Sequence, residues 1–137
     1  MPLINLAIAY AMSFVGTPYK WGGSNPIEGM DCSGFVQEVL ASVGLDPSGD
    51  QTAQSLYNHF KITGTSEIVP GAIVFFGKDT KTITHVAFCI DALHCIEAGG
   101  GGSRTVTRDD ASKHNAFIRV RPIIHRKDIQ AVILPKY

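Results

Sequence analysis

Charge is scarce in this sequence, and neither sign predominates. Twelve Lys and Arg stand against twelve Asp and Glu, and charged residues make up only 18% of the 137 positions. The absence of a basic excess argues against a nucleic-acid-binding protein, and the absence of an acidic excess argues against a solubilising tail. Because 45% of the residues are hydrophobic, the composition also excludes a disordered chain and suffices to fill one core.

Cysteines and long apolar runs are few as well. Three cysteines cannot all pair within one chain, so at least one thiol is free or pairs with another chain. This count does not fit a disulfide-stapled secreted domain. The apolar run at residues 3–15 is too short to span a bilayer. A secretory signal requires a positively charged start, but no Lys or Arg precedes Lys20. We therefore expect a protein that has no membrane partner, is made in the cytoplasm and needs another route if it works outside.

The periodicity predicts helices first and strands later. Apolar residues recur at the helical period over residues 32–43, with Asp31 as a natural N-cap and Gly44 behind them. Two further helices are predicted over residues 3–15 and 52–60. Runs of β-branched and aromatic residues predict strands at 73–76, 84–90, 93–98, 117–121 and 131–134. This order predicts an α+β fold in a single domain over residues 1–137, with a flexible glycine-rich loop at 99–103.

Cys32 is the residue that points to chemistry. It opens the predicted second helix directly after the capping Asp31. Unpaired amide groups and the helix dipole at that end favour the thiolate over the thiol, which makes the sulfur a nucleophile near neutral pH. The position alone is equally consistent with a buried structural cysteine.

A nucleophilic thiol needs a base, and His85 is the best candidate because it opens a predicted strand just after a polar turn. His59 fits an exposed position on the short helix. The surroundings of His114 and His125 are polar and typical of loops, so we expect all three to be solvated.

Hairpin geometry separates His85 from the remaining candidate, His94. A turn centred on Asp91 would place His85 opposite Glu97, with both side chains on one face and Cβ atoms about 5 Å apart. Glu97 could then orient the imidazole, whereas His94 would pair with Phe88 and point to the other face. A one-residue slip of the register would bring His94 to this face instead of Glu97.

A zinc site is a rival interpretation of this hairpin. It would combine His85, Cys89, His94 and Cys95. Residues 85 and 89 lie roughly 13 Å apart along one strand, which is too far for a shared ion. We therefore expect no metal and no cofactor, and we interpret Cys89 and Cys95 as small core residues.

Four blocks of the sequence resemble the successive signatures of the NlpC family of papain-like cell-wall cysteine peptidases. Their order and spacings match over nearly the whole chain, and the block around Cys32 is the specific one. The blocks are Gly16-Thr17-Pro18-Tyr19-Lys20-Trp21-Gly22-Gly23, Met30-Asp31-Cys32-Ser33-Gly34-Phe35-Val36-Gln37, Pro70-Gly71-Ala72-Ile73-Val74-Phe75-Phe76 and His85-Val86-Ala87-Phe88.

The resemblance implies N-terminal helices packed on a central antiparallel sheet, with the nucleophile at a helix N-terminus. It also implies hydrolysis of an amide bond in peptidoglycan stem peptides, next to D-γ-glutamyl, through a thioester. By resemblance, Cys32 is the nucleophile, His85 the base and Glu97 the third catalytic residue, a position that is more often neutral in the family. A charge there should make His85 more basic.

The resemblance also suggests residues that contact substrate. Tyr19 matches a tyrosine that lines the family's cleft, and Asp31 and Ser33 flank the nucleophile. These two residues either touch substrate or only cap the helix. Ala72 stands where the family commonly has Asp after Pro-Gly, which should matter only to a turn.

Two other functions stay open. The chain could be a structural or tail-assembly protein that keeps the fold without turnover, or a thiol-dependent amidase or acyltransferase that passes the acyl group to an amine. As an enzyme, it resembles stand-alone members from phage tails and lysis systems, and its partners would be stem peptides and the delivery proteins of a virion, lysis system or secretion device. A neutral domain has no basic surface with which to hold an anionic wall by itself.

Overall fold

The structure is a computed structural model that describes residues 2–137. Its centre is a five-stranded antiparallel sheet in the order β6-β5-β4-β3-β7. The strands of this sheet are β3 (Ile73–Gly77), β4 (Ile83–Cys89), β5 (His94–Gly99), β6 (Phe117–Pro122) and β7 (Ile129–Ile133). The helices are α1 (Leu3–Met12), α2 (Cys32–Ala41), α3 (Ala53–Phe60), the 3-10 turn η1 (Lys61–Thr63) and α4 (Arg108–His114).

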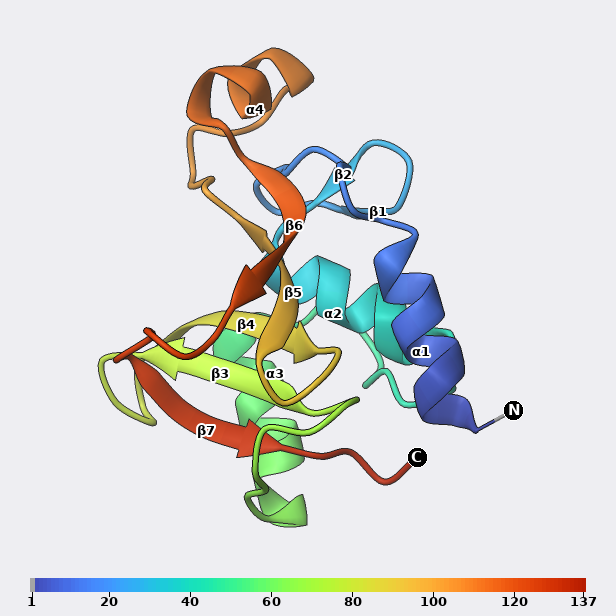
Figure 1. Cartoon of the computed structure of the whole chain (residues 1–137). Coiled ribbons are helices and arrows are strands. Elements are labelled where there is room, and N and C mark those ends of the chain that lie inside the picture. Colours follow the sequence, from blue (N-terminus) through green and yellow to red (C-terminus); the bar gives the residue numbers. More distant parts are fainter. Residues whose placement is uncertain (1) are drawn as a thin grey trace.

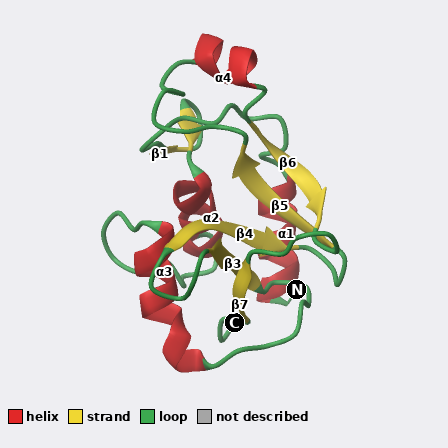
Figure 2. Cartoon of the chain, turned by 90° about the vertical axis from the view of Figure 1, so that its left-hand side faces the viewer, coloured by secondary structure: helices red, strands yellow, loops and turns green. Residues whose placement is uncertain are grey.

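The first three helices cover one face of this sheet (Figures 1 and 2). Alternate residues of β3 explain the arrangement, because Ile73 and Phe75 join the core beneath the helices while Val74 and Phe76 face a second, smaller cluster. At the centre, α2 packs on β4 and β5. The α+β architecture predicted from the sequence, with helices on an antiparallel sheet, is confirmed.

The predicted helices and strands are present, with shifted ends. The helix expected over residues 3–15 ends at Met12, and a turn carries the chain to Gly16, whose φ is 96°. The helix expected to reach residue 43 ends at Ala41. The predicted strands at 84–90 and 131–134 correspond to Ile83–Cys89 and Ile129–Ile133. Helix and strand ends depend on local turns, which periodicity does not specify.

Besides the 3-10 turn η1, three elements were not predicted. Two are the short strands β1 (Ser24–Asn25) and β2 (Gly29–Met30), which pair with each other. The third is α4, where the sequence led us to expect loop around His114. Thr107 and Asp110 form a capping box at its start and Asn115 ends it in the left-handed region, so a local helix signal was present without an apolar period. These elements form one end of the molecule (Figure 1).

The predicted register of the β4–β5 hairpin is wrong by two residues. Phe88 pairs with Ile96 and Cys89 with Cys95, so His94 is not opposite Phe88. The Asp91 carboxylate accepts hydrogen bonds from the backbone N–H groups of Leu93 and His94, at 2.7 Å each, which centres the turn on Ala92. Because the shift is an even number of residues, each side chain stays on its expected face, and Glu97 remains on the same face as His85.

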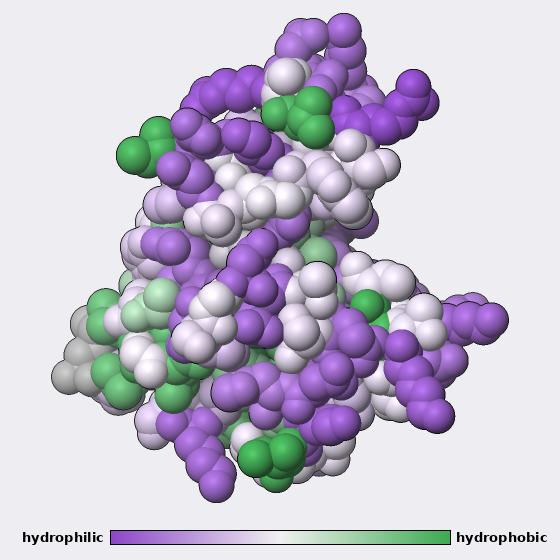
Figure 3. Space-filling model, turned by 180° about the vertical axis from the view of Figure 1, so that it is seen from behind, coloured by the Kyte–Doolittle hydropathy of each residue, from purple (hydrophilic) through white to green (hydrophobic). Residues whose placement is uncertain are grey.

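The surface seen from the back of the molecule is mixed. Apolar areas there are separated by hydrophilic ones (Figure 3). Within residues 2–137, no helix combines the length and the hydropathy needed to cross a bilayer.

Candidate active site

The position of Cys32 is set by the hydrogen bonds that start α2. Asp31 has an extended backbone, and its Oδ1 accepts hydrogen bonds from the backbone N–H of Gly34 at 2.8 Å and the hydroxyl of Ser33 at 3.2 Å. Helical geometry therefore begins at Cys32, the first residue of α2. The N–H of Gly34 is bonded to Asp31, whereas the N–H groups of Cys32 and Ser33 have no acceptor within the helix and are available as hydrogen-bond donors beside the thiol.

The other carboxylate oxygen of Asp31 binds a second part of the chain. Its Oδ2 accepts a hydrogen bond from the backbone N–H of Gly22 at 3.1 Å, and the Asp31 N–H donates to the Gly23 carbonyl at 3.0 Å. Burial raises the pKa of Asp31, although these hydrogen bonds act in the opposite direction. A Cβ added to Gly34 would lie 2.2 Å from the Gly23 carbonyl oxygen. The turn and the helix thus meet at a distance that only glycine allows.

Tyr19 forms another wall of the site. It is buried, and its backbone N–H donates to the carbonyl of Ala116 at 3.0 Å. A Cβ on Gly101 would lie 2.2 Å from the Tyr19 ring, and Gly100 has a φ of 81°. The glycine-rich loop therefore has a steric function, because it packs against this ring. Burial, followed by the charge of Cys32, raises the pKa of Tyr19.

His85 lies where β4 departs from regular pairing. Phe76 pairs with His85 but Gly77 pairs with Ile83, so Thr84 is an extra residue in β4. The imidazole packs against the Phe76 ring with centroids 5.4 Å apart, and its side chain is 21% exposed. The packing against Phe76 supports the ring, and the exposed part of His85 lines the cleft.

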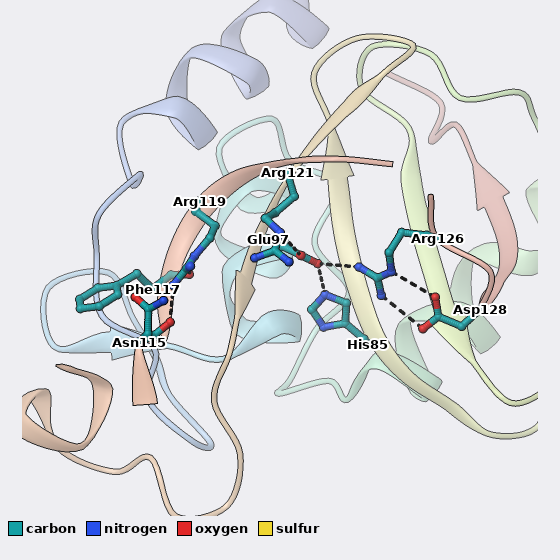
Figure 4. Close-up of polar contacts among 8 residues, drawn as sticks. All are labelled: His85, Glu97, Asn115, Phe117, Arg119, Arg121, Arg126 and Asp128. Carbon is teal, nitrogen blue, oxygen red and sulfur yellow. Dashed lines mark hydrogen bonds and ion pairs between the residues drawn. The ribbon is translucent and has the colours of Figure 1, made fainter. Parts of the chain in front are cut away.

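Glu97 binds the His85 imidazole. Its Oε2 is hydrogen-bonded to Nε2 of His85 (Figure 4), and the residue is only 4% exposed. Since Glu97 occupies Nε2, Nδ1 is the ring nitrogen left to exchange a proton with Cys32. Burial raises the pKa of Glu97, but the interactions with His85, Arg126 and Arg121 outweigh it, so the pKa is lowered and the carboxylate is ionised.

The same contacts stabilise the charged form of His85. Burial lowers its pKa, but interactions with Cys32 and Glu97 more than offset that effect and raise the pKa to about 9. The imidazolium is therefore the form present at neutral pH. A cation at this position supplies a partner for the negative charge that the sulfur carries as a nucleophile.

Two arginines also contact Glu97, and neither was identified from the sequence. Arg126 Nη1 lies 3.5 Å from Oε2, and Arg121 Nε lies 3.8 Å from Oε1. Arg126 is held by a two-pronged contact with Asp128, at 3.1 and 3.3 Å, and its guanidinium lies 3.9 Å from the centroid of the Phe76 ring. The spacing of Arg126 and Asp128 could have indicated their local pair. Nothing in the sequence places that pair beside Glu97, 29 residues away.

A cleft runs past the thiol as two adjoining hollows, which share Tyr19, Trp21, Cys32 and Thr84. One, of about 290 Å³, extends along His85 and Glu97 to Arg126 and the loop of Gly99, Gly100 and Gly101. The other, of about 320 Å³, is lined by Asp31, Ser33, Asp50, Gln51 and Thr52. Trp21 stands 52% exposed between them. The cleft thus contains all six residues singled out from the sequence, and it adds Trp21, Thr84, Asp50 and Arg126.

The remaining histidines and cysteines lie elsewhere. His59 and His125 are exposed, and His94 pairs with Asp91 at the hairpin turn. His114 is exposed too, but it ends α4 rather than lying in a loop, and its Nδ1 is 2.8 Å from the Thr105 hydroxyl.

Cys89 and Cys95 face each other in the smaller core cluster. Burial raises the pKa of each to about 12, so both are thiols at neutral pH. Among residues 2–137 no group of three or more His, Cys, Asp or Glu side chains is placed to hold a metal ion.

Comparisons with known proteins identify the family. A model described as the NlpC/P60 family matches residues 16–121. "Bifunctional muramidase/DL-endopeptidase CwlT" of Bacillus subtilis (strain 168) is 42% identical over 82 residues, which are 58% of this chain and 24% of that protein. "Gamma-DL-glutamyl hydrolase" of the same organism is 33% identical over 98 residues, 71% of this chain and 24% of that protein. The chain spans about a quarter of the length of these relatives.

A solved structure shows the same fold without the chemistry. RipD from Mycobacterium tuberculosis, described as a non-catalytic NlpC/p60 domain protein adapted to peptidoglycan binding, superimposes with a TM-score of 0.67 at 18% sequence identity. The match covers 100% of this chain and 99% of RipD. The fold is therefore shared, and the activity has to be inferred from the residues in the cleft.

Alkylation tests the expected difference between the three thiols. Iodoacetamide at pH 7 should modify Cys32 much faster than Cys89 or Cys95, because only Cys32 combines solvent access with a cationic neighbour. Mass spectrometry of the intact chain should show one adduct, and peptide mapping should place it on Cys32. An equal rate for Cys32 and a model thiol would contradict a reactive nucleophile.

The close contact at Gly34 predicts a loss of stability. Gly34→Ala should lower the free energy of unfolding by about 1–3 kcal/mol in urea titrations, because the new methyl group would collide with the Gly23 carbonyl. Gly102→Ala is the matched control, since a Cβ there meets nothing within 4 Å. Equal stability of the two variants would show that the turn and the helix can separate without cost.

Proposed function

The chain belongs to the NlpC/P60 family, and we propose that it is a cysteine endopeptidase that hydrolyses an amide bond in peptidoglycan stem peptides. One observation carries the proposal. Cys32 at the start of α2 shares a cleft with His85, and the second ring nitrogen of His85 is held by the ionised Glu97. That arrangement supplies a nucleophile, a proton donor and an orienting anion in one place.

The first half-reaction forms a thioester. The Cys32 thiolate adds to the amide carbonyl carbon, and the oxygen becomes an oxyanion. As the carbon–nitrogen bond breaks, imidazolium His85 gives a proton to the departing amine. Glu97 stays ionised and keeps the ring aligned, as its lowered pKa requires.

Backbone groups at the start of α2 would stabilise the oxyanion. The N–H groups of Cys32 and Ser33 have no acceptor within the helix, and the helix dipole adds positive potential there. Asp31 fixes this end of the helix from both oxygens. The donors are thus oriented before substrate arrives, which is the condition for efficient electrostatic catalysis.

The second half-reaction releases the acyl group. Neutral His85 accepts a proton from water, the hydroxide adds to the thioester carbonyl, and the carbon–sulfur bond breaks to regenerate the thiolate. The products are the carboxylic acid of one fragment and the amine of the other. His85 must therefore be protonated in the first half-reaction and neutral at the start of the second.

For the bond, we propose a D-γ-glutamyl linkage. The support is the likeness to a protein named gamma-DL-glutamyl hydrolase and to one named a DL-endopeptidase. Tyr19, Asp31 and Ser33 line the hollow beside Cys32, and we propose that they contact the peptide. Both oxygens of Asp31 already accept hydrogen bonds, so Asp31 also retains the capping role.

Two alternatives remain as outcomes of the test. RipD shows that this fold also exists in a protein described as non-catalytic, so a structural or tail-assembly function is compatible with the fold. Acyl transfer to an amine uses the same thioester and differs only in the second nucleophile. The assembled Cys32, His85 and Glu97 favour hydrolysis over the structural alternative.

For delivery, we propose that another module or protein brings this domain to the wall. The support is the zero net charge, which gives little electrostatic attraction to an anionic polymer. A virion, a lysis system or a secretion device would each serve. The relatives named above are bacterial proteins, so they give the phage association no support.

Hydrolysis can be measured directly. Purified muropeptides incubated with the wild type should yield a new amine and a new carboxylate, and Cys32→Ala should reduce the rate about a thousandfold or more because no thioester can form. Wild type without product would contradict the proposal, and so would Cys32→Ala with undiminished activity. A new amide in the presence of added amines would indicate transfer instead.

The charge of Glu97 predicts a pH effect. With the pKa of His85 at about 9, the rate of thioester formation should fall as the pH rises through that value, because the imidazolium is lost. Glu97→Gln removes the anion, and the basic limb of the rate profile should move to lower pH by about one pH unit or more. Glu97→Asp, which keeps the charge, is the matched variant. An unmoved limb in Glu97→Gln would show that Glu97 does not set the protonation of His85.

A further inference from the structure

Arg126 occupies an unusual position for a cation in a site that relies on an imidazolium. It lies in the segment between β6 and β7, lines the same hollow as Cys32 and His85, and is 30% exposed. Its guanidinium covers the Phe76 ring, which also packs against the His85 imidazole. Arg126 therefore packs on the same phenylalanine ring that supports the His85 imidazole.

The charged and titratable groups around His85 come from four parts of the chain. They are Cys32 from α2, Glu97 from β5, Arg121 from β6, and Arg126 with Asp128 from the segment after β6, while the neutral Tyr19 closes the cleft. Apart from His85 and Cys32, this set contains two cations and two anions. Removal of Arg126 would leave a net negative charge beside the imidazole.

Of the two arginines that contact Glu97, Arg126 makes the closer contact with the carboxylate. It binds the same oxygen, Oε2, that bonds to His85, whereas Arg121 is 52% exposed and lies 3.8 Å from the other oxygen. Asp128 fixes the guanidinium with two contacts. A side chain that is held in this way loses little further entropy when it contacts Glu97, so its charge acts at a defined place.

We propose that Arg126 is a positioning residue that acts through Glu97, as the counter-charge that limits how strongly this carboxylate holds the proton on His85. The buried Glu97 orients the ring as a neutral residue could, but it adds a full negative charge. Arg126 offsets part of that charge without leaving the carboxylate free to rotate. In the reaction proposed above, on which this catalytic consequence rests, the offset matters in the second half-reaction, where His85 has to be neutral to accept a proton from water.

The test is the titration of the His85 ring, followed by NMR of the full chain carrying ¹³C-labelled histidine, with His85→Gln to assign the signal. Arg126→Gln should raise the pKa of His85 by about half a pH unit or more, since a like charge is removed from its surroundings. Asp128→Asn removes an anion and should lower it. Arg126→Lys keeps the charge and should move it less than Arg126→Gln does.

Arg119→Gln provides the matched control. Arg119 is the residue directly across from Glu97 on β6, but its guanidinium turns away and donates to the carbonyl of Asn115 (Figure 4). This variant removes one positive charge from the same neighbourhood without removing a contact to Glu97, so the His85 titration should stay at the wild-type position. Far-UV circular dichroism should verify that each variant is folded.

The proposal is falsifiable because it predicts shifts of the His85 pKa in opposite directions for Arg126→Gln and Asp128→Asn. A pKa of His85 that is unchanged or lowered in Arg126→Gln would overturn it, as would an equal rise in Arg119→Gln. If Arg126→Gln does not fold, Asp128→Asn and Arg126→Lys still test the sign and the size of the charge effect. The titration requires no substrate, so a protein inactive on muropeptides would contradict the proposed function while leaving this measurement intact. For an active enzyme, single-turnover kinetics should show slower release of the acyl group from Arg126→Gln at neutral pH.

Discussion

The site depends on the junction between the start of α2 and the turn before it. The carboxylate of Asp31 accepts hydrogen bonds from both of these segments. One oxygen caps α2 through Gly34 and Ser33, and the other binds the backbone of Gly22 in the turn that precedes it. These bonds decide where the helix begins, and hence that Cys32 lies in its first turn. They also bring Trp21, next to Gly22, to the edge of the cleft. Nucleophile, oxyanion donors and cleft wall are thus placed by one side chain.

The second constraint is electrostatic. A buried carboxylate at Glu97 stabilises the imidazolium of His85, which lines the same hollow as Cys32. A charge this well buried is costly unless it is paired. Arg126 and Arg121 supply the pairing from a part of the chain that follows the catalytic residues by more than twenty positions. The buried Glu97 carboxylate can remain ionised because these two cations compensate part of its negative charge.

Helix α4 and the β4–β5 register show which features the sequence patterns do not specify. The capping box of α4 was visible in Thr107 and Asp110, but a helix without an apolar period gives no signal of burial. The β4–β5 register was two residues off because Asp91 accepts two backbone hydrogen bonds and centres the turn one position later. This error does not change the predicted site, because a shift by an even number of residues leaves Glu97 on the same face of the sheet. Family membership, in turn, defines the fold and leaves catalysis to the cleft, as the likeness to RipD illustrates.

The sequence by itself determined what depends on neighbouring residues. The 3.6-residue and two-residue periods specify the helices and strands, and the Asp31-Cys32 pair specifies a capped thiol, because capping and amphipathicity act over a few positions. Only the tertiary structure decided which groups meet across long separations: the bulge that turns His85 into the cleft, and Arg126 with Asp128 beside Glu97. Strand pairing and loop packing fix those contacts, and they depend on the whole fold rather than on any local pattern.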